Sequence, residues 1–400
     1  MRIFKFLSLI LVLTLTGCMS MVDNEPENNA IDTSAVEMQR RISKEKAVYI
    51  GGQVLNKVST RAASLETPSF EYVLNESNTR SISLPDTLAY ILNYPNNGGF
   101  VIVATDTRVN PVLAFSSTGN FSLDNEIAKE NFIDKIGGYI DSSDPENFVE
   151  FDDNIFDDCY SYNPSLPIYL NQNSPWNKYV TIENPNCPVG CVAVATAYVM
   201  CYSKVQLTYH NSVFHLKSMI EAINKGPNNG AQNVKRYVVG GEDAIPNPKN
   251  PEQPVYSYEQ AVDSMAKLLY WIGKDVNMDY NEGGSSAFSS DAFTLLKNLG
   301  YNLTENNTKY DSKQICRYIK SNHIVYLRGT RINASTGHAW IVDGAHFCVG
   351  LYDENEILDH YLHCDWGWGG SGNGYYNGEV FFPDSRGYKP TYYSAIKREW

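Results

Sequence analysis

Between residues 34 and 150 the sequence contains neither cysteine nor histidine. Nucleophilic and acid–base catalysis rely largely on these two side chains, so this part of the chain is poor in catalytic candidates. The chain also lacks an excess of basic residues, because its formal net charge is -13 at pH 7. Binding to a nucleic acid needs a basic face, and we therefore expect no nucleic-acid partner.

A long apolar run is missing as well, and with it any candidate transmembrane helix. The apolar segment from Phe6 to Leu15 follows a positively charged start and is only about ten residues long, which suits the core of a signal peptide. It ends in Leu15-Thr-Gly-Cys18, a pattern typical of a bacterial lipobox. We therefore predict a lipoprotein signal peptide over residues 1–17, lipidation of Cys18 and anchoring of an exported protein in the cell envelope. An ordinary secretory signal with a chance cysteine is the alternative.

The sequence has no pair of tightly spaced cysteine motifs of the kind that binds structural zinc. Cys187, Cys191 and Cys201 are spread over one stretch, and no second close pair follows. We expect neither a metal nor an organic cofactor. Beyond Cys18 the number of cysteines is odd, so at least one thiol is unpaired within an exported chain, and the pairing of the others stays open.

Composition divides the remaining chain into three parts. Residues 18–33 are polar and acidic and predict a flexible tether. Residues 34–150 combine one helical pattern, from about residue 34 to 57, with several strand patterns, and predict a small α+β domain. An acidic, turn-rich junction follows, and all seven histidines lie beyond it, in residues 151–400. This second part begins with helices and ends rich in strands, so we predict an α+β fold for it too.

Two residues of the second part are candidates for a catalytic pair. Cys191 stands where a loop meets an apolar helix, and free N–H groups and the helix dipole at such a position favour the thiolate. A buried core cysteine is the alternative for this residue alone. His338 opens an apolar strand after Gly337, about 147 residues further on, a remove comparable with that of papain-type chains.

A third group can hold the imidazole of such a pair in one tautomer. Asp365 and Trp366 begin a segment in which two tryptophans alternate with glycines, directly after an apolar strand. The carboxylate of Asp365 could orient His338, and the ring of Trp366 could keep water from that contact. A glycine-rich turn with aromatic packing explains Trp368 more easily than it explains Trp366.

Together these segments resemble the streptopain family of papain-like cysteine peptidases. The family's motifs around the nucleophile and the base resemble Gly190-Cys191-Val-Ala-Val-Ala195 and Gly337-His338-Ala339. Its Asn-Trp-Gly-Trp-Gly-Gly motif is similar to residues 365–370, with Asp365 in place of the asparagine. The segment Asn171-Gln172-Asn-Ser-Pro-Trp-Asn177 resembles the family's upstream motif. Residues 97–106 resemble part of its inhibitory propeptide.

The resemblance implies a papain-like fold, with a helical part and an antiparallel sheet or barrel part, behind an inhibitory prodomain over residues 34–150. It implies that Cys191 is the nucleophile, His338 the base and Gln172 the oxyanion donor, with Asp365 and Trp366 in support. Substrate contacts fall on Ser286 and Gly337. The expected function is that of a secreted thiol endopeptidase zymogen that acts on protein or peptide substrates, with its own prodomain as an intramolecular inhibitor.

Two functions of other classes compete with this prediction. An amidase or acyl-transfer enzyme acting on cell-wall peptides would use the same nucleophile and base. A catalytically silent lipoprotein could inhibit peptidases through its first domain, although it would have no use for the intact cysteine, histidine and glutamine set.

Overall fold

The computed structural model describes residues 40–58, 67–75, 84–124, 133–153, 159–163, 168–226, 245–247, 250–330, 337–349, 356–381 and 392–398. The predicted signal peptide, Cys18 and the predicted tether lie outside these residues. Within them, no helix combines the length and the apolar character that crossing a membrane requires.

The first region is a small α+β unit built on four antiparallel strands. The strand β3 pairs with β2 on one side and with β4 on the other. Both β3 and β4 are buried throughout, because nearly every residue in them is apolar. Asn96 and Asn97 adopt positive φ in the turn before β3, as the Asn-Asn-Gly-Gly sequence predicts. The elements are α2 (Lys44–Val58), β1 (Ser69–Leu74), β2 (Thr87–Asn93), β3 (Phe100–Ala104), β4 (Val112–Ser116) and α4 (Asp134–Ser142).

The first helix begins later than the sequence pattern predicts. Residues 34–39 lie outside the described residues, and Arg40 to Ser43 are not helical. The Ile42 N–H donates to the carbonyl of Thr105, and Arg41 forms an isolated bridge with Asp106, so this segment runs beside the sheet before α2 starts. Ile42, an apolar residue that fits the helical spacing, therefore bonds to the main chain next to β3 and does not lie in the helix.

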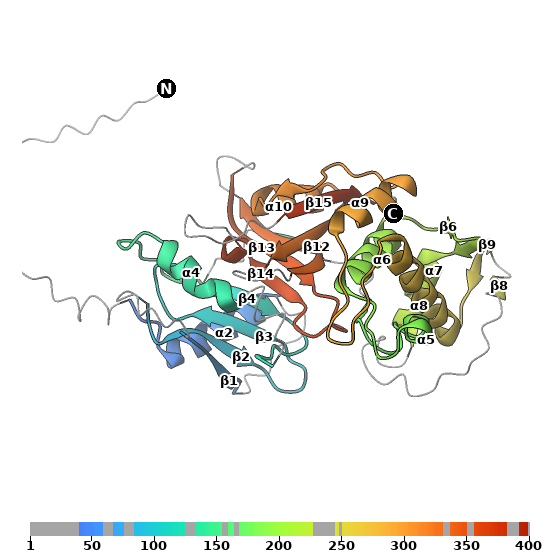
Figure 1. Ribbon diagram of the computed structural model, residues 1–400. Coiled ribbons are helices and arrows are strands. Elements are labelled where there is room, and N and C mark those ends of the chain that lie inside the picture. The colour runs from blue at the N-terminus through green and yellow to red at the C-terminus, as the bar shows by residue number, and fades with distance from the viewer. Residues whose placement is uncertain are drawn as a thin grey trace, which may run out of the picture. The chain divides into compact units, whose positions relative to one another are not determined.

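A helical part follows, in which α6, α7 and α8 pack on one another (Figure 1). Every residue of α6 after Cys191 is buried, as expected for a helix that is apolar all round. Ser257 and Gln260 form a capping box that starts α8. The elements are α5 (Val180–Glu183), α6 (Cys191–Ser203), β6 (Leu207–Tyr209), β7 (Ser212–Phe214), α7 (Leu216–Lys225), β8 (Ile245–Asn247), β9 (Asn250–Val255), α8 (Tyr258–Asp275) and α9 (Ser289–Asn298).

The strand-rich part forms the second half of one antiparallel sheet, in the order β1-β2-β3-β4-β14-β13-β12-β11-β15-β10, with β5 paired to β12. One long strand, β12, includes the apolar stretches around Ala339 and Phe347, because residues 344–346 between them also pair across the sheet. The elements are β5 (Cys159–Tyr162), β10 (Thr308–Lys309), α10 (Ser312–Lys320), β11 (His323–Thr330), β12 (Gly337–Val349), β13 (Ile357–Asp365), β14 (Gly374–Asn377), η3 (Gly378–Phe381) and β15 (Tyr392–Lys397).

The first region and the strand-rich part are joined through β4 and β14. Phe115 and Ala114 pair with Tyr375 and Tyr376 across this junction. One hydrophobic cluster contains Phe100 and Phe121 of the first region together with the strand-rich part's own core. The helix α6 packs on the strands β11 and β12, which places its start beside the start of β12.

Candidate active site

Cys191 is the first residue of α6, as the sequence predicts. Gly190 before it adopts φ +85°, and a Cβ atom built there would lie 2.7 Å from the sulfur of Met278 and 3.1 Å from the carbonyl oxygen of Ser285. Only glycine therefore allows residues 278–285 to approach the start of the helix so closely. The Ser285 hydroxyl donates to the carbonyl of Pro188 at 2.6 Å and fixes this contact.

The surroundings of the Cys191 thiol favour its neutral form. Although the residue as a whole is half-buried, protein atoms surround the sulfur, and burial raises the thiol pKa. The N–H groups of Ala339, Val192 and Cys191 itself act in the opposite direction and lower the pKa, but burial is the larger effect. The expected stabilisation of the thiolate at the helix start is therefore present but outweighed.

His338 lies at the second position of β12 and is 4% exposed. Its Nε2 atom forms a hydrogen bond with the main-chain carbonyl of Trp366, at 3.0 Å. Burial lowers the pKa of the imidazole to about 4, while the contact with the Trp366 carbonyl raises it. At neutral pH the ring is uncharged, so it donates the Nε2 hydrogen to that carbonyl and leaves Nδ1 as an acceptor.

The two candidate residues are brought to the same place by the packing of α6 against β12. The N–H of Ala339, the residue next to His338, lies against the Cys191 sulfur. Among the described residues, however, no hydrogen bond links the Cys191 thiol to the His338 ring, since the histidine's side-chain bond goes to Trp366. The two residues are adjacent in this structure but not joined by a hydrogen bond.

The Asp365 side chain has another hydrogen-bond partner in this structure than His338. The hydrogen bond at Nε2 of His338 comes from the main chain of the next residue and not from the carboxyl of Asp365. That carboxyl instead accepts the N–H of Gly367 at 3.0 Å. Burial and the nearby Asp343 raise its pKa to about 7. A side-chain motif could not reveal this, because the contact to the histidine is made by a carbonyl that every residue carries.

Three tryptophans surround His338. The ring centroid of Trp368 lies 5.1 Å from that of the histidine, Trp340 lies at 5.9 Å and Trp366 at 6.4 Å. The indole N–H of Trp366 lies 3.1 Å from both the carbonyl of Gly372 and the hydroxyl of Tyr376, which fixes the ring. Sequence reasoning favoured Trp366 over Trp368, yet Trp368 stacks closest to the histidine ring. The alternation of tryptophan and glycine was the signal for both.

Gln172 is half-buried and its main chain is tied to the loop before the nucleophile. The N–H of Val189 donates to the carbonyl of Gln172 at 2.9 Å, only two residues before Cys191. The turn at Gly367 packs on the same helix, because a Cβ atom there would lie 2.8 Å from the Val194 side chain. Both segments thus border α6.

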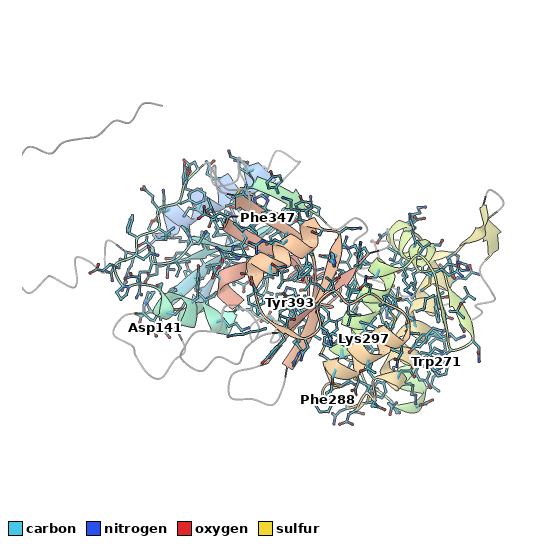
Figure 2. All side chains as sticks on the ribbon, turned by 90° about the horizontal axis from the view of Figure 1, so that it is seen from above. Asp141, Trp271, Phe288, Lys297, Phe347 and Tyr393 are labelled. Atoms are coloured by element: carbon cyan, nitrogen blue, oxygen red, sulfur yellow. A yellow bond between two sulfur atoms is a disulfide. The ribbon has the colours of Figure 1, made fainter. Side chains whose placement is uncertain are left out.

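The two residues expected to contact substrate lie on different segments. Ser286 pairs with Asp279 through reciprocal N–H···O bonds of 3.0 and 2.8 Å, in the loop that packs on Gly190. Phe288 follows at the start of α9 and is 78% exposed (Figure 2). Gly337 is exposed and pairs with Thr330 at the beginning of β12.

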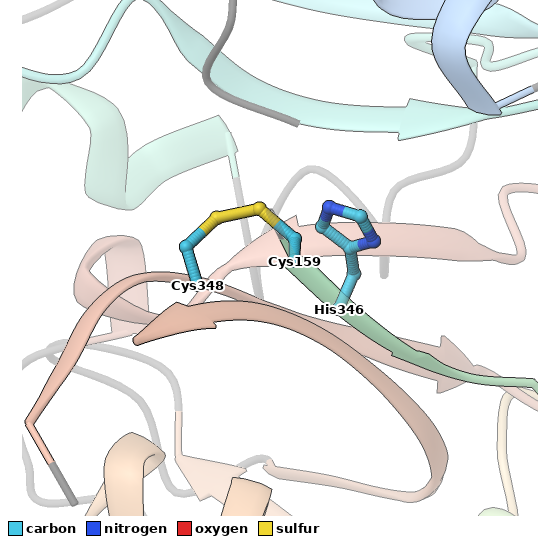
Figure 3. Close-up of side chains that lie close together, drawn as sticks. All are labelled: Cys159, His346 and Cys348. Atoms are coloured by element: carbon cyan, nitrogen blue, oxygen red, sulfur yellow. A yellow bond between two sulfur atoms is a disulfide. The ribbon is translucent and has the colours of Figure 1, made fainter. Parts of the chain in front are cut away.

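A second group of cysteine and histidine side chains lies on β5 and β12. Figure 3 shows Cys159, Cys348 and His346, whose side-chain ligand atoms all lie within 4.8 Å of one another. Cys159 and Cys348 form a disulfide, and Nδ1 of His346 lies 2.7 Å from the Ser161 hydroxyl. Sulfur in a disulfide carries no thiolate, so in this state neither cysteine can be a nucleophile or a metal ligand.

A cysteine at a helix start, beside a histidine on an antiparallel sheet, defines the site of a cysteine-type peptidase of papain-like α+β fold. Residues 170–376 match the model of the peptidase C10 family, and residues 39–134 match that of the Spi protease inhibitor. The chain belongs to the peptidase C10 family. It is a hydrolase with an inhibitor-type propeptide domain, and this membership favours the peptidase prediction over both alternatives.

The chain is also similar to other known proteins. The chain is 28% identical over 340 residues to streptopain of Streptococcus pyogenes serotype M28 (strain MGAS6180), a match that covers 74% of this chain and 75% of the relative. Streptopain of Streptococcus pyogenes serotype M1 matches with the same identity and coverage. A solved fragment of prointerpain A from Prevotella intermedia is 18% identical, with a TM-score of 0.49, and the match covers 82% of this chain and 98% of that one.

Proposed function

We propose that the chain is the zymogen of a lipid-anchored cysteine endopeptidase in which Cys191 is the nucleophile and His338 the general base and acid. The observation that carries this proposal is the packing of α6 on β12, which sets the Cys191 sulfur against the N–H of the residue next to His338. Residues 18–33 would be the tether, 34–150 the prodomain and 151–400 the peptidase domain.

The reaction would begin with transfer of the thiol proton to Nδ1 of His338. The thiolate attacks the peptide carbonyl, a C–S bond forms, and the carbonyl oxygen takes the negative charge. The Cys191 N–H and the Gln172 side-chain amide would stabilise this oxyanion. The imidazolium then protonates the leaving amine as the C–N bond breaks, and the thioester remains. His338 next takes a proton from water, whose oxygen attacks the thioester carbonyl. The C–S bond breaks, the acid leaves, and the Cys191 thiolate remains beside the imidazolium of His338.

The surrounding residues would keep the base in place. The Trp366 carbonyl would hold the Nε2 hydrogen and so fix the tautomer that leaves Nδ1 free for the thiol proton. The rings of Trp366 and Trp368 would exclude water from the imidazole. Asp365 would act on the turn that carries this carbonyl, through its bond to Gly367, rather than on His338 directly. Ser286 and Gly337 would border the bound peptide.

Burial of both groups, which disfavours the charged pair, supports latency in the presence of the prodomain. Buried Phe121 of the first region lies 6.4 Å, ring to ring, from Tyr376, whose hydroxyl contacts the Trp366 indole. Removal of the prodomain would uncover this cluster, admit water and substrate, and let the thiolate–imidazolium pair form.

Substitution of the proposed nucleophile tests the function. After the prodomain is removed, the wild-type peptidase should cleave casein, and Cys191→Ala should lose at least about 10³-fold in kcat/KM. His338→Ala should behave alike, and a folded thermal transition should persist in both. Cleavage by Cys191→Ala at the wild-type rate would refute the assignment.

The lipid anchor is tested separately from catalysis. A chain expressed in a bacterial host should enter the membrane fraction and carry labelled fatty acid, and Cys18→Ala should abolish both. Release of the unlabelled wild-type chain into the medium would show an ordinary secretory signal instead.

A further inference from the structure

Tyr198 lies on α6 two turns after Cys191, and neither its ring nor its hydroxyl is exposed. The hydroxyl donates to the carbonyl of Ile168 at 2.8 Å and accepts the N–H of Leu170 at 2.9 Å. One phenol thus satisfies two main-chain groups of a segment that has no helix or strand of its own. Such a segment depends on side chains for its hydrogen bonds and therefore for its position.

This segment leads directly to Gln172. Its other side is held by the aromatic turn, because the N–H of Gly369 donates to the carbonyl of Leu170 at 2.8 Å. The carbonyl of Gln172 accepts the N–H of Val189 from the loop before Cys191. The main chain around Leu170 is therefore fixed between α6 and the turn that carries Trp366 and Trp368.

Tyr198 also reaches the start of that turn. Its hydroxyl interacts with the carboxyl of Asp365, which itself accepts the N–H of Gly367. A phenol has one hydrogen and two lone pairs. The hydrogen goes to Ile168 and one lone pair to Leu170, so the two main-chain bonds of this segment are the contacts that fix the hydroxyl. Burial and the nearby Asp343 raise the pKa of Asp365 to about 7, while the contact with Tyr198 lowers it.

We propose that Tyr198 is a positioning residue for peptide hydrolysis, whose hydroxyl holds the Gln172 segment and the Asp365–Trp366 turn in register with the nucleophile helix. The oxyanion donor, the carbonyl that orients the base and the nucleophile come from three segments distant in sequence. The Tyr198 hydroxyl is the point at which contacts from all three meet. This inference rests on the function proposed above and adds a residue that touches neither substrate nor the reacting atoms.

Tyr198→Phe removes the hydroxyl and keeps the ring. In the prodomain-free enzyme we expect kcat to fall about 10- to 100-fold with KM nearly unchanged, because misplaced oxyanion and base contacts act mainly on the transition state. The combined loss with Gln172→Ala should be smaller than the sum of the two single losses, since the hydroxyl acts in part through Gln172. Titration of the active thiol would give kcat per folded molecule.

Tyr301→Phe is the matched control. The Tyr301 hydroxyl is also buried and lies 3.4 Å from a carbonyl of α6, that of Met200 near the far end of the helix. Tyr301→Phe should lower the free energy of unfolding without changing kcat. Equal loss of kcat in both variants, or strictly additive effects of Tyr198→Phe and Gln172→Ala, would reduce Tyr198 to a structural residue and overturn the proposal.

Two further experiments test the proposal if Tyr198→Phe does not fold and separate it from the proposed function. If Tyr198→Phe does not fold, 3,5-difluorotyrosine at position 198 keeps ring and hydroxyl but weakens the bond accepted from Leu170, and kcat should still fall. Wild-type kcat in the fluorinated enzyme would overturn the proposal. Activity in Cys191→Ala would refute the proposed function itself, whereas an inactive Cys191→Ala beside a fully active Tyr198→Phe would refute only the role of Tyr198.

Discussion

The first region and the peptidase region bury different kinds of side chain. Among the described residues of 40–153 the buried acidic and basic side chains are Asp106, Arg108 and Lys135, and the first two form a 2.7 Å ion pair. The peptidase region buries His338, His346 and His360, each with a pKa lowered by burial to about 4. The first region thus buries no histidine among its described residues, whereas the peptidase region holds histidines that would bind a proton more readily if water reached them.

The same comparison explains how one region can restrain the other. Their apolar side chains form one hydrophobic cluster, which includes Phe121 on the prodomain side and Trp366 on the peptidase side. The sheet is also continuous from β4 to β14. Loss of the prodomain would therefore change the surroundings of Trp366, whose ring lies beside that of His338.

The largest expected effect comes from weakening this junction. Phe115 stacks on Tyr375 at 5.2 Å and meets Tyr361 at 5.2 Å. Phe115→Ala should destabilise the zymogen by about 3–5 kcal/mol, as for other buried phenylalanines, and speed the appearance of activity. Thermal unfolding and a time course of casein cleavage measure both. Tyr72→Ala, which changes an exposed ring on β1, is the control, and equal effects of the two changes would contradict a role for the junction.

The disulfide should matter for stability and not for catalysis. Cys159 and Cys348 are 189 residues apart in sequence, and within the described residues β5 pairs with β12 alone. Replacing both cysteines with serine should lower the free energy of unfolding by about 2–4 kcal/mol and leave kcat of folded enzyme close to wild type. Loss of activity on the scale of Cys191→Ala would instead place Cys159 and His346 in the reaction.

A smaller effect on the free energy of unfolding is expected at acid pH. His346 lies 6.0 Å, ring to ring, from Phe115 of the prodomain, and the unfolded chain binds its proton more readily than the folded one. The free energy of unfolding should therefore fall as pH drops from about 6.5 towards 4, by about 2 kcal/mol for this histidine at pH 5. His346→Gln should reduce the difference between melts at pH 7 and pH 5. An unchanged difference would show that His346 does not titrate with unfolding.

Much of the fold follows from local patterns, and part of the site does not. The strand at Phe100–Ala104 and the helix start at Cys191 are where apolar spacing, glycine and turn residues predict them. The sequence does not predict that the Trp366 carbonyl bonds to His338, because every residue has a main-chain carbonyl. It does not predict the disulfide of Cys159 either, because that bond depends on which distant strands pair. Burial likewise decides the pKa of Cys191, and a helix-start motif reports only the opposing effect.

The most direct test of this account is the rate at which Cys191 reacts with iodoacetamide, located by peptide mass spectrometry before and after removal of the prodomain. We predict slow labelling of Cys191 in the zymogen and fast labelling in the mature peptidase, down to a pH well below the ordinary thiol pKa. Replacement of His338 by alanine should abolish the fast phase. Equal labelling rates in both forms, or fast labelling of another cysteine with Cys191 untouched, would contradict the account.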